Sequence, residues 1–139
     1  MNLITAIEDL QREAQGIQDF LEISVSDNPE EVVQRGNDLS VYIARTGKMC
    51  ADAEYHRDAV LNSEAVRILK EQAAAPASVI NKMIDAACKE TNYLVKWCDR
   101  LNRTATHQQD WCRSVLSKAK EEMRLSGGMS NTYNNKPPF

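Results

Sequence analysis

The sequence of 139 residues predicts a single all-α domain, a bundle of three to four long helices. Apolar residues recur every three or four positions over most of the chain, and no stretch alternates as a strand does. Hydrophobic residues make up 42% of the chain and aromatic residues only 6%. This content suffices for narrow helical seams, and it favours further burial between subunits. We therefore expect a homo-oligomer.

The first helix is expected over about residues 2–22. Its apolar positions alternate four and three residues apart, the heptad spacing of a coiled coil or a bundle helix. Two interpretations stay open: the seam packs inside its own domain, or it joins subunits. For the second case, the candidate oligomerisation residues are Leu3, Ile7, Leu10, Ile17 and Leu21.

Two further helices are expected, over about residues 29–74 and 78–125. Pro29 suits a first helical position, and Pro76 ends the second helix because the residue before a proline avoids helical angles. The four-three alternation then continues from Ser78 without a gap. Glycines 127 and 128 should end the third helix. The domain is thus residues 1–125, followed by a polar tail over residues 126–139 that we expect to be flexible alone.

Charge is distributed unevenly along the chain, although the formal net charge is only −3. Residues 1–31 carry eight acidic side chains and one basic one, whereas residues 96–125 carry seven basic and four acidic side chains. An acidic start and a basic end favour head-to-tail pairing of chains or a basic face for a polyanion. Ordinary solvated helix faces are the competing interpretation.

The cysteine pattern and the hydropathy indicate a cytoplasmic protein. Four cysteines are present without any Cys-x-x-Cys pair, and the acidic N-terminus does not resemble a signal peptide. We expect reduced thiols that pack as small core residues. No stretch approaches the roughly 18 apolar residues that a membrane span needs, so no membrane association is expected.

No motif in the sequence predicts an enzyme, a cofactor or a metal site. Residues 45–49 resemble a phosphate-binding loop, but Met49 stands where a Ser or Thr must reach magnesium. The two histidines, His56 and His107, lack the ligand pairs that a helical metal site requires. Cys112 lies five residues beyond His107, which is a poor spacing for a nucleophile and its base.

Basic and aromatic residues cluster between residues 96 and 113. The cations repeat along one helical face, and the two tryptophans follow beside them, as suits single-stranded nucleic acid: cations neutralise phosphates and rings stack on bases. The competing interpretation places the tryptophans in the core with cations around them. The candidate nucleic-acid-binding residues are Lys96, Trp97, Arg100, Arg103, His107, Trp111 and Arg113, with Lys48 and Arg57 as secondary candidates.

Two segments resemble the UvsY recombination mediators of tailed phages. They are LSVYIARTGKM at residues 39–49, which starts a long charged helix, and YLVKWCDRL at residues 93–101, which leads into a basic helix. The resemblance covers about residues 38–125 and rests on layout and scattered positions. It implies a ring-like homo-oligomer that binds single-stranded DNA. It also implies help in loading a recombinase onto strands covered by a single-strand-binding protein, within a bacterial host cell.

The DNA-binding motif of that family falls on residues 52–58 of this chain. Only Tyr55 and Arg57 match it, among nearby acids, so DNA binding is expected on the face from Lys96 to Arg113 instead. The sequence thus predicts a non-enzymatic recombination mediator. The alternative, favoured by the net charge and the acidic N-terminus, is a helical adaptor or inhibitor that binds another protein and no nucleic acid.

Overall fold

Four helices packed together make up the structure, a computed structural model that describes the backbone of residues 3–134 and the side chains of residues 3–127. No strand occurs in this range, which confirms the all-α bundle. The helices are α1 (Ile7–Leu21), α2 (Pro29–Glu71), α3 (Ala77–Ala87) and α4 (Lys89–Asn134).

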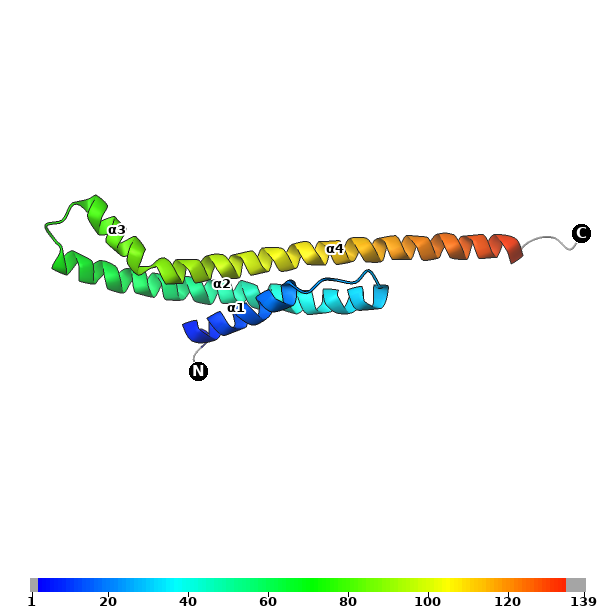
Figure 1. Ribbon diagram of the computed structural model, residues 1–139, viewed down its shortest axis with the longest axis horizontal. Coiled ribbons are helices and arrows are strands. Elements are labelled where there is room, and N and C mark those ends of the chain that lie inside the picture. Colours follow the sequence, from blue (N-terminus) through cyan, green and yellow to red (C-terminus); the bar gives the residue numbers. More distant parts are fainter. Residues whose placement is uncertain (1–2, 135–139) are drawn as a thin grey trace, which may run out of the picture.

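The two long helices α2 and α4 run antiparallel and form the body of an elongated molecule (Figure 1). The short helix α1 lies along both of them and runs in the same direction as α4. Helix α3 packs mainly on the C-terminal end of α2. The last turns of α4, drawn orange to red, extend beyond the start of α2 (Figure 1).

The start of α2 agrees with the sequence prediction. The Asn28 side chain accepts a hydrogen bond from the Glu30 amide at 3.0 Å, and Pro29 occupies the first helical position. This cap satisfies one of the amides that a helix start leaves unpaired. The helix ends at Glu71, three residues before the predicted end, and a turn over residues 72–75 leads to α3.

The prediction of one helix over residues 78–125 is wrong at two points. A turn at Cys88 separates α3 from α4, because the apolar seam of α3 faces the end of α2 while α4 changes direction to follow α2 lengthwise. At the other end, α4 continues through both glycines to Asn134. No described glycine has a positive φ, so the left-handed turn that would end this helix does not form. Residues 135–139 of the predicted tail lie outside the described residues.

The seam of α1 packs inside its own chain. Leu10, Ile17 and Leu21 are at most 6% exposed and join one core with residues of α2 and α4. These side chains therefore have no surface to offer a second copy, which corrects their assignment as oligomerisation residues. Ile7 packs partly against the same core, whereas Leu3 is 74% exposed and precedes the helix, which begins at Ile7 and not at residue 2.

One buried cation joins α1, α2 and α4. Arg35 is 9% exposed, and its Nη2 donates to the carbonyls of Phe20 (3.1 Å) and Ile23 (3.3 Å) and to Gln108 Oε1 (2.8 Å). Its guanidinium also lies 4.0 Å from the centroid of the Phe20 ring. Desolvation by burial lowers the pKa of Arg35, but an arginine stays charged at neutral pH. Here carbonyls at the C-terminal end of a helix balance that charge.

A second polar contact fixes the register of α2 against α4. Asn102 Nδ2 donates to the Ile43 carbonyl at 2.9 Å and to Thr46 Oγ1 at 3.0 Å. Thr46 is fully buried and in turn donates to the Tyr42 carbonyl. A slip of either helix would leave these buried groups unpaired, which costs more than a hydrogen bond gains.

Within the described residues, no helix has the length and apolar character required to cross a membrane.

We predict that Arg35→Met lowers the free energy of unfolding by roughly 1.5–3 kcal/mol, because three acceptors lose a charged donor. Urea unfolding monitored by circular dichroism measures this change. Arg35→Lys should recover part of the loss, because an ammonium group keeps the charge but cannot reach all three acceptors at once. Unfolding curves of Arg35→Met that overlay the wild-type curve would show that Arg35 does not join these helices.

Candidate nucleic-acid interface

The structure places four of the predicted nucleic-acid-binding residues, three cations and one histidine, on one exposed face of α4. Lys96, Arg100, Arg103 and His107 are all exposed, and at 3.6 residues per turn they fall within an arc of about 60°. This arc lies opposite the buried side of the helix, which faces α1 and α2. We name these four residues the α4 stripe.

The cations of the α4 stripe differ in their partners. Arg103 pairs with Asp99 at 3.1 Å, and both side chains are exposed. An exposed ion pair of this kind contributes only about 0–1 kcal/mol to stability. A phosphate could therefore displace the Asp99 carboxylate. Among the described residues, Lys96 and Arg100 form no ion pair. Positive charge is therefore least compensated at these two positions.

Arg113 lies away from the α4 stripe, on the side of the helix next to α2. It pairs with Asp110 at 3.5 Å and lines a shallow hollow with residues of α2, among them Val33 and Ser40. The structure therefore does not bring Arg113 together with Arg100 and Arg103, although the sequence analysis grouped them.

The two tryptophans occupy different environments. Trp97 is partly buried against the core, and its Nε1 donates to Gln18 Oε1 of α1 at 3.1 Å. This is the position of a core residue and not of a base-stacking platform. Trp111 is 43% exposed, and it lies between the α4 stripe and α1. Its ring is therefore open to a ligand that follows the stripe.

Tyr93 is an exposed aromatic residue that the sequence analysis missed. Its side chain is 67% exposed, and its ring lies 6.2 Å from that of Trp97. It occupies the same edge of α4 as Trp111, because eighteen residues equal five full turns. The spacing of four residues between Tyr93 and Trp97 could have revealed it. The edge of the α4 stripe nearest α1 thus carries one aromatic ring at each end.

A surface hollow of about 410 Å³ opens beside Trp111. It lies between α4 and the segment that joins α1 to α2. Its lining residues are Leu21, Glu22, Ile23, Ser24, Val25, Gln108 and Trp111. Gln108 is held rigidly there, because its Nε2 donates to the Leu21 carbonyl at 2.9 Å while its Oε1 accepts from Arg35. We call this feature the Trp111 hollow. No pattern in the sequence indicates this hollow.

Lys48 and Arg57, the secondary candidates, lie on α2 and already have partners. Lys48 pairs with the buried Asp52 and donates to the Leu3 carbonyl at 2.9 Å. Arg57 pairs with its neighbour Asp58 at 3.4 Å. Because both residues belong to α2, they do not form part of the α4 stripe. The bond from Lys48 to the Leu3 carbonyl also holds the N-terminal segment against α2.

The N-terminal segment is fastened to α2 by a polar cluster. Thr5 donates its amide to Asp52 Oδ2 at 3.1 Å, and its carbonyl lies 2.7 Å from His56 Nε2. Burial alone would raise the pKa of Asp52, but hydrogen bonds from Lys48 and Thr5 outweigh it and lower the pKa. A lowered pKa means that this stabilisation is present above the ordinary value of 3.8 and is lost as the pH falls below it.

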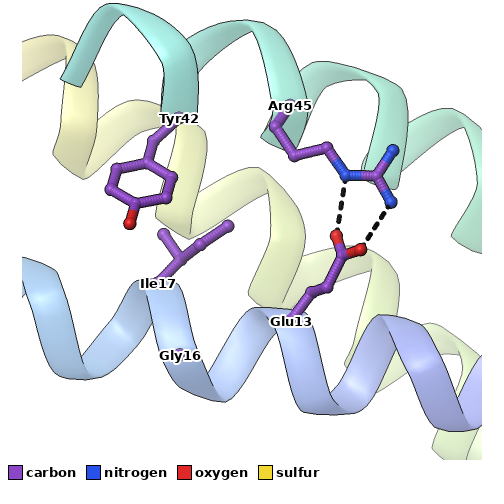
Figure 2. A pocket seen from close by; sticks show the side chains of 5 residues that line it. All are labelled: Glu13, Gly16, Ile17, Tyr42 and Arg45. Carbon is purple, nitrogen blue, oxygen red and sulfur yellow. Dashed lines mark hydrogen bonds and ion pairs between the residues drawn. The ribbon is translucent and has the colours of Figure 1, made fainter. Parts of the chain in front are cut away.

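Helices α1 and α2 are also joined by an ion pair beside an open hollow of about 440 Å³ (Figure 2). Arg45 donates to both carboxylate oxygens of Glu13, at 2.7 and 3.0 Å, while Gly16, Ile17 and Tyr42 line the remainder. The hydrogen bond with Glu13 raises the pKa of Arg45. Because these groups satisfy one another, we read this hollow as structural. The neighbouring glycine at position 47 lies within α2 and not in a phosphate-binding loop.

No metal-ligand cluster or reactive thiol stands out in the described part of the chain. No three His, Cys, Asp or Glu side chains converge there as metal ligands would. All four cysteines are free, and three of them are buried. Burial raises the pKa of Cys50 to about 11 and that of Cys98 to about 12, with a smaller contribution from nearby Asp99 at Cys50.

Comparison with known proteins adds no relative: no family model, no curated protein and no solved structure matches this chain.

We predict that Trp111 is quenched more strongly than Trp97, because only Trp111 has a largely accessible ring. The Trp97→Phe and Trp111→Phe variants each keep one tryptophan, and acrylamide quenching of their fluorescence compares the two. The slope should be higher for Trp97→Phe. Equal slopes, or a steeper slope for Trp111→Phe, would contradict the placement of these rings.

We predict that Cys50 and Cys98 resist alkylation at neutral pH, because the thiolate is the nucleophile. A raised folded pKa also makes their contribution to stability complete below the ordinary value of 9.0. This contribution is lost as the pH rises through about 11 for Cys50 and about 12 for Cys98. Urea unfolding across this window should show a falling free energy, with a shallower fall in Cys50→Ala. Rapid labelling of Cys50 or Cys98 in the folded protein at neutral pH would contradict the assignment.

Proposed function

We propose that this chain is a non-enzymatic protein that binds single-stranded DNA along the α4 stripe. The observation that carries the proposal is the combination of two uncompensated cations, Lys96 and Arg100, with the exposed rings of Tyr93 and Trp111 on one helix. Cations attract the phosphates and exposed rings stack on unpaired bases. The rings suit a single strand, because the bases of a duplex are not free to stack on them.

The α4 stripe alone would bind weakly. From Lys96 to His107 the helix rises by eleven residue steps, which span about 16.5 Å at 1.5 Å per residue. This length is enough for only a few phosphates. Several stripes in a homo-oligomer would raise the affinity by engaging one strand together. We therefore include a homo-oligomer in the proposal, held by surfaces other than the buried seam of α1.

The biological role in the proposal is that of a phage-type recombination mediator in the host cytoplasm. In this role the protein helps to load a recombinase onto strands covered by a single-strand-binding protein. The support is the resemblance of residues 38–125 to the UvsY mediators, together with the independent position of the α4 stripe inside that range.

A second candidate function is a protein-interaction module, and one observation favours it. The end of the molecule where α2 meets α3 exposes large apolar side chains, including Val66, Leu69, Val79 and Met83. None of the residues of α3 is buried. Exposed apolar surface of this kind is typical of sites that bind another protein.

The proposed function is tested with a fluorescent oligothymidylate, whose anisotropy is recorded at low and at moderate salt. We expect binding that weakens as salt rises, because bound phosphates release counterions. Arg100→Glu should weaken binding and reduce the slope of log K against log salt by about 1. The matched control is Lys82→Glu, which makes the same charge change on α3 instead of on the α4 stripe. This variant should bind the oligonucleotide about as tightly as the wild type.

Absence of binding by folded wild-type protein at low salt would overturn the proposed function and favour the protein-interaction module. Equal loss in Arg100→Glu and Lys82→Glu would show that net charge, and not the α4 stripe, governs the affinity.

A further inference from the structure

The Trp111 hollow has the position of a subsite for the α4 stripe. Trp111 follows His107 by four residues, so the hollow begins one helical turn from the last residue of the stripe. Its lining also includes Ile23, which is 60% exposed on the segment between α1 and α2. A strand that follows the stripe would therefore pass the mouth of the hollow.

The walls of the hollow suit a flat ring. Its lining includes the exposed indole of Trp111 and the aliphatic side chains of Ile23 and Val25. A volume of about 410 Å³ falls in the range of ligand pockets, ~300–1,000 Å³. A base turned out of a single strand could stack on this indole, as bases do on exposed aromatic side chains in single-strand-binding proteins.

The polar groups of the hollow favour hydrogen-bond donors on the ligand. Glu22 brings a carboxylate, of which Oε1 accepts from Gln18 at 2.7 Å. The other oxygen, Oε2, accepts no hydrogen bond from the described residues. The side-chain amide of Gln108 already has a partner at each polar atom, because its oxygen accepts from Arg35 and its nitrogen donates to the Leu21 carbonyl. An ionised carboxylate accepts hydrogen bonds only, so a phosphate would be repelled here.

Among the four bases, guanine offers the best match to a carboxylate. Its Watson–Crick edge carries N1–H and the N2 amino group side by side, two parallel donors for one acceptor group. Adenine and cytosine place a ring-nitrogen acceptor beside a single amino group, and thymine flanks its one N–H with two carbonyl oxygens. Each of these acceptors would face the negative charge of Glu22.

We propose that the Trp111 hollow is a base-recognition subsite that takes one guanine of the strand bound along the α4 stripe. The guanine ring stacks on Trp111, and the Glu22 carboxylate accepts from its N1–H and N2 amino groups. This inference rests on the proposed function and gives the bound strand a sequence preference, which the phosphate contacts of the stripe cannot supply.

The test compares a twelve-nucleotide oligothymidylate with the same strand carrying one central guanine, by anisotropy at low salt. We expect the guanine strand to bind about tenfold more tightly, within the discrimination of a good bidentate base contact. Glu22→Gln should remove this preference while the oligothymidylate still binds. The matched control is Glu8→Gln, an exposed carboxylate of the first turn of α1, which should keep the preference.

The outcomes separate the subsite from the function. Oligothymidylate binding without a guanine preference, or with an equal gain from a central adenine or cytosine, overturns the subsite and leaves the function standing. Failure of every strand to bind overturns the function. A second arm then uses the nucleosides alone: in Trp97→Phe, guanosine should quench Trp111 more strongly than thymidine does, and equal quenching overturns the subsite.

Discussion

The buried guanidinium of Arg35 is the interaction on which the rest of the structure depends. It joins the C-terminal end of α1, the start of α2 and the middle of α4 through one nitrogen and three acceptors. Among the described residues no carboxylate forms an ion pair with Arg35, although the charge of Asp38 acts on it from further away. Helix-end carbonyls and the Phe20 ring are its direct contacts. Two of the three acceptors, the Ile23 carbonyl and Gln108, also belong to residues of the Trp111 hollow. The cation that closes the bundle therefore shapes the site beside it.

The placement of α1 also explains how an acidic segment can lie beside a basic face. The acidic Glu13 is paired with Arg45 of α2, and the contact of α1 with Trp97 is made by the neutral amide of Gln18. Glu22, which directly follows α1, lines the Trp111 hollow. Glu13 is thus neutralised by α2, and in the proposed subsite Glu22 faces a base rather than a phosphate.

Much of the fold could be predicted from local signals, whereas the site could not. The Asn28–Pro29 start and the core positions of α4 follow from capping and from helical periodicity. The turn at Cys88 could not be predicted, because the apolar spacing continues through it and only the contacts with α2 require a change of direction. Likewise, periodicity gave the same weight to Trp97 and Trp111. Their difference depends on Gln18 and on Ile23, which lie far away in sequence and are brought near by the packing of α1.

The most direct test of the account is a map of backbone amide chemical shifts in isotope-labelled protein titrated with a short oligothymidylate. The account predicts shifts concentrated between Tyr93 and Trp111 on α4 and in the segment from Leu21 to Val25. It predicts little change on α3 or around Lys48 and Arg57. Shifts concentrated on α3, or on α2 near Arg57, would contradict the claim that the exposed face of α4 binds the strand.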